Sequence, residues 1–228
     1  MRLVTLFSIM SLLQFACGAQ AASIFNGSMN DGNVGTDYNT FNTVVPTGWS
    51  TLSGTPDQLN TPDLFDANTN FGNFAWGAST DGGTFVHGLA EGNSDEGVAQ
   101  DITGLIIGQA YTISFEQSIS NRSGFNAAGD TGDWLVTFGG TTKSSSAMTT
   151  PTLNSTFSWQ DQTLIFIATA TTQQIKFVAN NITGTRVDLG LDGVSIVAAV
   201  PVPATVWLFA SGLLGLVGAA RHRKTKTV

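Results

Sequence analysis

The chain has 228 residues, of which 42% are hydrophobic and 11% charged, and its formal net charge is −7 at pH 7. All 16 acidic residues lie between Asp31 and Asp192, where only four basic residues oppose them, so this stretch has a net charge of −12. A surface of this sign repels phosphate backbones, which excludes nucleic acid as a partner and suits neutral sugars or divalent cations. Simple solubility outside the cell explains it equally well.

Residues 1–22 have the features of a secretory signal peptide. Arg2 precedes an apolar run from Leu3 to Cys17, and a short sequence with small residues, Ala19-Gln20-Ala21, follows. The run is too short to span a bilayer comfortably, and the short sequence has the A-x-A form of a cleavage site. We expect cleavage after Ala21 or Ala22; the alternative is a buried N-terminal helix.

Cys17 is the only cysteine in the chain. It could be the lipid-bearing first residue of a bacterial lipoprotein, but Gln14 stands where such a signal has an aliphatic residue. Cleavage at Ala21 removes Cys17. The mature chain then has no disulfide, no cysteine nucleophile and no thiolate metal site.

The middle of the chain, residues 23–199, alternates apolar and polar residues as half-buried strands do. The predicted strands are Tyr111–Phe115, Trp134–Phe138, Leu164–Ala168, Gln174–Ala179 and Leu191–Val197. Turn signals are expected at Gly104, Gly108, Gly139-Gly140, Asn180-Asn181, Gly184 and Gly193. Because no 3.6-residue period occurs before Ala204, these patterns predict a single all-β sandwich domain.

Residues that could carry chemistry are few in this domain. His87 is its only histidine, and no G-x-S-x-G, H-E-x-x-H or P-loop motif occurs. We expect His87 to be packed or solvated. Glycoside hydrolysis needs two carboxylates in unlike environments, whereas Glu91 and Glu96 share one loop-like, solvated segment. The sequence therefore predicts a protein that is not an enzyme.

Sugar binding would use exposed aromatic rings as stacking platforms. Trp134 and Trp159 lie in strand patterns and are expected in the core, and Trp49 is expected to pack after a Pro-x-Gly turn. Trp76 lies in a Gly/Asn-rich segment and is the first choice for a ligand contact, with a core position as the alternative. Asp66-x-Asn68-x-Asn70 resembles a calcium loop, but it lacks the glycine and the closing glutamate of an EF-hand.

The segment 200–228 follows a different pattern. Pro201 and Pro203 exclude a regular helix there, so a helix begins only near Ala204. Running to Ala220, it would be roughly 25 Å long, slightly less than a hydrocarbon core of about 30 Å. The basic residues that follow, which include Arg221, Arg223 and Lys224, would stay on the cytoplasmic side and stop transfer there. This pattern predicts a C-terminal transmembrane helix with the acidic domain outside.

A proline motif, Val200-Pro201-Val202-Pro203-Ala204, is followed by the apolar run and then by the basic cluster. This segment resembles the PEP-CTERM sorting signal in its VPxPA form. The resemblance implies a bacterial exported protein that an exosortase-type membrane protease cuts near the prolines. It also implies that the chain is at first anchored in the inner membrane with its domain in the periplasm. The domain would then reach the cell surface or the extracellular matrix, in association with exopolysaccharide and biofilm. Val202 replaces the glutamate of the commoner form, which leaves the exosortase subtype open.

The stretch Val98–Phe115 reads Q-x-I-x-x-L-x-x-G-x-x-Y-x-I-x-F from Gln100 onward. With Asn26-Gly27-Ser28 and Leu191–Ile196 it resembles the galactose-binding-like jelly roll of many carbohydrate-binding modules. The resemblance implies a jelly-roll β-sandwich that binds polysaccharide or another glycan without catalysis. A purely structural matrix protein and a secreted hydrolase are the alternatives. The resemblance also implies a structural calcium ion held by Asn30 or Asp31 with Asp192, unless these are ordinary turn-forming residues.

Overall fold

A computed structural model describes residues 21–31, 43–60, 76–92, 94–153 and 155–199. Nearly all of the predicted signal peptide and the whole segment 200–228 lie outside the described residues. No helix in the described part is long and apolar enough to cross a membrane.

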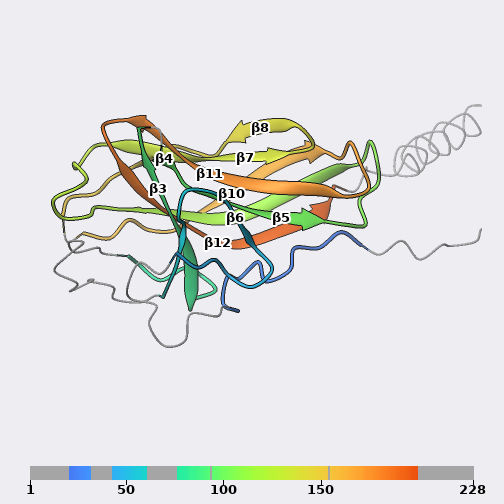
Figure 1. Ribbon diagram of the computed structural model, residues 1–228, viewed down its shortest axis with the longest axis horizontal. Helices are drawn as coiled ribbons and strands as arrows, with labels where there is room; N and C mark the ends of the chain where they lie inside the picture. The colour runs from blue at the N-terminus through green and yellow to red at the C-terminus, as the bar shows by residue number, and fades with distance from the viewer. Residues whose placement is uncertain (1–20, 32–42, 61–75, 93, 154, 200–228) are drawn as a thin grey trace, which may run out of the picture.

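Two antiparallel sheets make up the domain (Figure 1). Sheet A has the order β1 (Ser50–Ser53), β5 (Gly97–Ile102), β11 (Gln173–Thr183), β7 (Thr131–Phe138) and β8 (Thr141–Ser144), and β9 (Met148–Thr149) also pairs with β7. Sheet B has the order β10 (Gln160–Ile167), β6 (Ala110–Ser120), β12 (Val187–Ala198), β3 (Thr84–Glu91) and β2 (Asp57–Asn60), and β4 (Ser94–Asp95) pairs with β3.

The path of the chain between the sheets is that of a jelly roll. From β3 onward the chain alternates between sheets, with β3, β6, β10 and β12 in sheet B and β5, β7–β8 and β11 in sheet A. The resulting orders, β3-β12-β6-β10 and β5-β11-β7-β8, are two interleaved Greek keys of eight strands. The predicted all-β jelly-roll sandwich is confirmed, and β1 and β2 extend it at the edges.

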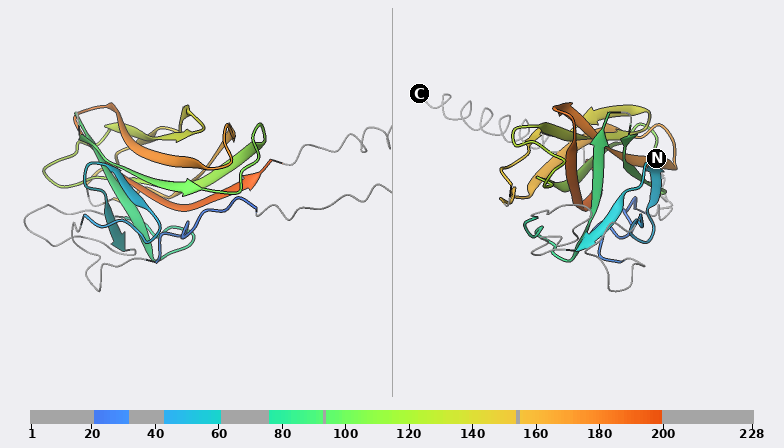
Figure 2. Two further views of the ribbon diagram at one scale, coloured as in Figure 1. Left: turned by 45° about the vertical axis from the view of Figure 1, so that its right-hand side comes forward. Right: turned by 60° about the vertical axis from the view of Figure 1, so that its left-hand side comes forward.

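The main core lies between the two sheets (Figure 2). Phe177 of sheet A packs against Phe115 of sheet B with ring centroids 5.1 Å apart. Trp134 is fully buried, and its indole N–H donates to the carbonyl oxygen of Gly190 in the opposite sheet at 3.1 Å. The predicted alternation is confirmed because Tyr111, Ile113, Phe115 and the Trp134 strand all place their apolar side chains in this core.

Two of the predicted turns are wrong, and the reason is local. Gly139 and Gly140 do form a two-residue hairpin turn with φ of 62° and 77°. Asn180-Asn181, however, lies inside β11, where Asn180 donates to the Asp133 carboxylate across the sheet at 2.6 Å. Gly193 lies inside β12 and forms a β-bulge, which needs glycine because its φ is 59°.

The outer face of sheet B carries a second, smaller core. Trp76, Phe85 and Leu59 are buried there, and Trp159 packs against them. Gly190 makes room for this cluster, since a Cβ atom at that position would lie 2.8 Å from Trp159 and 2.9 Å from Trp76. His87, Asp188 and Asp192 alternate with main-core residues of β3 and β12, so they lie on this same outer face.

Candidate functional site

A pocket of about 500 Å³ lies where the N-terminal segment meets β1, β5 and β11 of sheet A. Its lining combines one exposed aromatic ring with carboxylate, amide and hydroxyl groups. The lining residues are Ser23, Phe25, Gly48, Trp49, Ser50, Ala99, Gln100, Asp101, Thr103 and Gln174.

Phe25 is held in this pocket as a rigid platform. Its backbone N–H donates to Gln100 Oε1 at 2.8 Å, and Gln100 Nε2 donates back to the Phe25 carbonyl oxygen at 2.8 Å. The ring lies against Gly48, where an added Cβ atom would be 2.3 Å from Phe25 Cδ1. Gly48 is therefore required both for this close approach and for its φ of 86°. With 58% of the residue exposed, the ring keeps an open surface that can stack on a ligand.

The polar groups beside Phe25 can bind hydroxyl groups. Asp101 is exposed, and its Oδ1 accepts a hydrogen bond from Gln174 Nε2 at 3.2 Å. The carboxylate keeps further lone pairs, while the Gln174 amide offers a second donor and an acceptor. An apolar ring next to such groups is the arrangement that recognises the two sides of a sugar, its C–H face and its hydroxyls.

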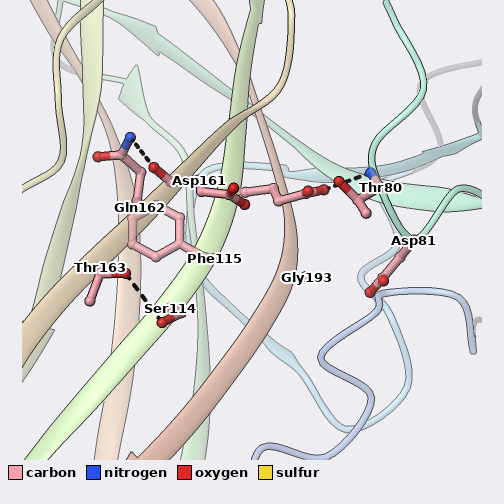
Figure 3. Close-up of a pocket in the computed structure, with 9 residues that line it drawn as sticks. Thr80, Asp81, Ser114, Phe115, Asp161, Gln162, Thr163 and Gly193 are labelled. Atoms are coloured by element: carbon pink, nitrogen blue, oxygen red, sulfur yellow. Dashed lines mark hydrogen bonds between the residues drawn. The ribbon is translucent and has the colours of Figure 1, made fainter.

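A second pocket, of about 420 Å³, lies on sheet B and is acidic (Figure 3). It is lined by Thr80, Asp81, Ser114, Phe115, Glu116, Asp161, Gln162, Thr163 and Gly193. Figure 3 shows Thr80 and Asp81 on their loop on one side, with Asp161, Gln162 and Thr163 on the other. The Thr80 backbone N–H donates to Glu116 Oε2 at 2.9 Å, which fixes the glutamate between the loop and β6.

Asp192 is fully buried next to the acidic pocket but does not line it. Ser79 Oγ donates to its Oδ2 at 2.5 Å, and the Gly193 N–H donates to its Oδ1 at 2.8 Å. Burial raises the pKa of the Asp192 carboxyl to about 7; these hydrogen bonds lower it, whereas the nearby charges of Asp81 and Glu116 raise it further. Asp192 is therefore a buried acid that holds its proton up to near-neutral pH.

This proton gives a pH dependence of stability that Asp192→Asn should remove. The ordinary carboxyl loses its proton near pH 3.8 and the folded one near 7, so between these values the native state holds more protons. The contribution of Asp192 to the free energy of unfolding therefore falls by roughly 3–4 kcal/mol as pH rises from 4 to 8. In urea unfolding at several pH values, the free energy of unfolding of Asp192→Asn relative to that of wild type should rise by that amount between pH 4 and pH 8.

Thr163→Val is the control for this measurement because it changes the pocket without removing a titrating group. The difference in free energy of unfolding between Thr163→Val and wild type should stay constant with pH. If the difference between Asp192→Asn and wild type is equally constant from pH 4 to 8, the assignment of a raised pKa to Asp192 is wrong.

A buried ionic network crosses β2, β3 and β12 on the outer face of sheet B. His87 Nε2 lies 2.8 Å from Asp188 Oδ1, and His87 Nδ1 lies 3.3 Å from Asp57 Oδ2. Arg186 binds Asp188 through Nε at 3.2 Å and Glu91 through Nη1 at 3.0 Å. Burial disfavours the charged imidazole, but hydrogen bonds from its two nitrogens to the carboxylates of Asp188 and Asp57 outweigh this effect and raise the pKa of His87 to about 9.

The site residues predicted from sequence have mixed outcomes. Trp76 is only 2% exposed and packs against Phe85 with ring centroids 4.8 Å apart, so it takes the core position given as the alternative and offers no exposed stacking ring. Asn30 Oδ1 accepts a hydrogen bond from the Thr84 N–H, and the Asp31 N–H donates to Asn26 Oδ1. No interaction between described residues joins either one to Asp192, so the calcium set stays a prediction.

The sorting residues Val200, Pro201, Val202, Pro203 and Ala204 lie outside the described residues. The same holds for the basic residues Arg221, Arg223 and Lys224, and for the transmembrane helix predicted between the two groups. Their role is therefore judged from the sequence and from the comparisons below.

Phe25, Glu96 and the partners of His87 were missed by sequence reasoning. Phe25 directly precedes the Asn-Gly-Ser signal, and Gln100, the first residue of the jelly-roll pattern, holds it; only their pairing in space reveals the platform. Glu96 was expected in a solvated loop but is only 6% exposed. The Leu89 N–H and the Thr55 hydroxyl both donate to its carboxylate, at 2.8 and 3.0 Å.

Comparison with known families finds one match: residues 199–224 carry the PEP-CTERM protein-sorting motif. This confirms the resemblance predicted from the prolines, the apolar run and the basic cluster. No curated protein sequence matches the chain.

Solved structures of similar shape include carbohydrate-binding modules and a cyclase. The chain is similar to TmCBM61 in complex with beta-1,4-galactotriose, at 12% identity, with 67% of this chain and 89% of that chain covered and a TM-score of 0.41. It is similar to the CBM22-1 xylan-binding domain from Paenibacillus barcinonensis Xyn10C, at 12% identity, 78% and 94% coverage and a TM-score of 0.44. A cyclase from Fischerella sp. TAU has 17% identity, 78% and 98% coverage and a TM-score of 0.49.

Proposed function

We propose that this chain is an exported, non-catalytic protein whose jelly-roll domain binds glycan at the Phe25 pocket, after sorting through its C-terminal signal. The sorting motif at residues 199–224 supports export and processing by an exosortase-type membrane protease. The observation that carries glycan binding is the fixed, 58% exposed Phe25 ring beside the Asp101 and Gln174 side chains. The protein would reach the cell surface or the extracellular matrix, in contact with exopolysaccharide.

The charge of the domain limits the class of glycan. Asp101 lies in the pocket, and the exported part carries many more acidic than basic residues. A polyanionic saccharide would be repelled by this field, whereas neutral and amino sugars would not. The ligand class we propose is therefore a neutral or amino-sugar polysaccharide.

The arrangement of carboxylates supports a non-catalytic role. A glycosidase needs an acid with a raised pKa that reaches the scissile oxygen, paired with a second carboxylate. Asp192 has the raised pKa, but it is fully buried and does not line the acidic pocket. Its carboxyl group therefore cannot reach a sugar bound at that surface without a rearrangement of β12.

Binding of the purified full chain to a panel of insoluble and soluble polysaccharides tests the proposal. We expect retention on at least one neutral or amino-sugar polysaccharide, and Phe25→Ala should weaken binding roughly fivefold to thirtyfold, because a stacked ring contributes on the order of 1–2 kcal/mol. Affinity electrophoresis and isothermal titration measure this loss.

Phe125→Ala is the matched control. Phe125 is also an exposed ring, at 45%, but it stacks on the Arg122 guanidinium at 4.1 Å and lies outside the pocket. The Phe125→Ala variant should bind the polysaccharide as wild type does. Retention on no polysaccharide would favour the purely structural matrix protein, and equal binding by Phe25→Ala and wild type would remove the Phe25 pocket from the proposal.

A further inference from the structure

Three metal-binding side chains from separate segments converge beneath the outer face of sheet B. Asp57 on β2, His87 on β3 and Glu96 between β4 and β5 each bring one ligand atom to within 4.8 Å of the others, and all three are buried. The donors are one imidazole nitrogen and two carboxylate oxygens. This mixed set suits zinc and related divalent transition metals, since imidazole is a poor ligand for calcium or magnesium.

The orientation of His87 directs one nitrogen at the carboxylates. Asp188 Oδ1, 2.8 Å from Nε2, is placed to accept a hydrogen bond from the Nε2–H group, and this orientation directs Nδ1 toward Asp57. A neutral ring held this way would point the Nδ1 lone pair at an anionic oxygen, which is repulsive unless a positive charge lies between them. A carboxylate on the far nitrogen is also the usual outer partner of a metal-binding histidine.

The spacing of the His87 and Asp57 donors fits a small cation. Two atoms bound at about 2.0–2.1 Å to a tetrahedral zinc ion lie about 3.3 Å apart, and His87 Nδ1 is 3.3 Å from Asp57 Oδ2. Glu96 Oε1 accepts from both the N–H and the hydroxyl of Thr55, whereas Oε2 accepts from the Leu89 N–H and has a second lone pair for a metal.

The charge balance distinguishes a proton from a divalent cation. Among the described residues of this cluster, three buried carboxylates (Asp57, Glu96 and Asp188) face one buried guanidinium, that of Arg186. A proton on His87 leaves a net charge of −1, whereas a divalent cation beside a neutral ring makes the group neutral. Because buried charges are stable only when balanced or bound to metal, a divalent cation would stabilise these three carboxylates.

We propose that Asp57, His87 and Glu96 form a structural binding site for a divalent transition metal ion of the zinc type, with Asp188 as the outer partner that orients His87. The site joins β2 and the β4–β5 segment to β3, and so fastens the edge of sheet B. The Trp76 ring, with its centroid 6.2 Å from that of His87, adds an apolar wall on one side. Since the donors are buried, the metal enters during folding.

Refolding of the purified, untagged full chain tests the site. The chain is unfolded with a chelator present, then refolded with Zn²⁺ alone, with Ca²⁺ alone or with EDTA. We expect one zinc per chain by elemental mass spectrometry and a melting temperature at least about 5 °C above the EDTA sample. Ca²⁺ should not bind at this site, because imidazole is a poor ligand for calcium, and Co²⁺ should give the visible d–d absorption of a bound ion.

Two variants locate the metal. Glu96→Gln keeps a side-chain acceptor for Leu89 but removes a ligand charge, and should lower zinc affinity at least tenfold. Glu91→Gln is the control, because Glu91 binds Arg186 from the exposed side and is not one of the three donors; it should bind zinc as wild type does. A wild-type chain that refolds without bound zinc, or a Glu96→Gln chain with unchanged affinity, overturns the proposal. If Glu96→Gln does not fold, the wild-type zinc content decides alone.

Discussion

Asp188→Ala is expected to lower the free energy of unfolding by roughly 3–5 kcal/mol, because it leaves two buried cationic partners without their shared carboxylate. Asp188 is fully buried, and it contacts His87 Nε2 at 2.8 Å and Arg186 Nε at 3.2 Å. Despite burial, these partners lower the pKa of the Asp188 carboxyl to about 2. Urea unfolding followed by tryptophan fluorescence, in EDTA at pH 6, measures the change.

Glu91→Gln is the comparison for this experiment because it removes the other carboxylate that binds Arg186. The Glu91 side chain is 53% exposed, so solvent screens its ion pair and the variant should lose less than about 1 kcal/mol. If Asp188→Ala and Glu91→Gln lower the free energy of unfolding equally, burial of the Asp188 carboxylate does not increase its contribution to stability.

The second large effect is expected at the sorting signal. Replacing both Pro201 and Pro203 with alanine removes the two residues that are expected to keep this segment out of the helix predicted after it. A continued helix hides its backbone from a protease, because proteases bind extended chain. In a bacterial host with an exosortase, we expect most of the double variant to stay uncleaved in the membrane fraction.

Val202→Ala is the matched control for the double variant, since it changes the same segment and keeps both prolines. It should be processed and released as wild type is. Cell fractionation and mass spectrometry of the mature C-terminus distinguish the outcomes. Equal processing of the proline variant would mean that an extended segment at residues 200–204 is not what the protease requires.

Sequence patterns succeeded where local rules decide the structure. Alternation in Tyr111–Phe115 and Trp134–Phe138 predicted which side chains enter the core, because successive side chains of a strand point to opposite faces. The turn signal at Asn180-Asn181 was misleading: these residues lie inside β11, where a hydrogen bond from Asn180 to Asp133 on the neighbouring strand stabilises the strand. That partner lies 47 positions away, beyond the range of any turn signal.

The pockets and the ionic network were beyond sequence reasoning for the same reason. His87 looked isolated, yet its partners Asp57 and Asp188 are 30 and 101 positions distant. Phe25 was not singled out in the sequence, and Gln100, 75 positions further on, makes it a fixed platform. The glycine and asparagine neighbours of Trp76 made it the first choice for a ligand contact, with a core position as the alternative, and contacts with Phe85 and Trp159 decide for the core.

The sequence by itself determined the strand pattern, the jelly-roll class and the sorting signal, because each of these is written in neighbouring residues: alternation, turn glycines, and a proline motif before an apolar run and a basic cluster. Only the tertiary structure decided which aromatic ring is open to a ligand, which carboxyl holds a proton and which histidine meets carboxylates. Those properties depend on burial and on distances between residues far apart in the chain, and both are set when the two sheets close on each other.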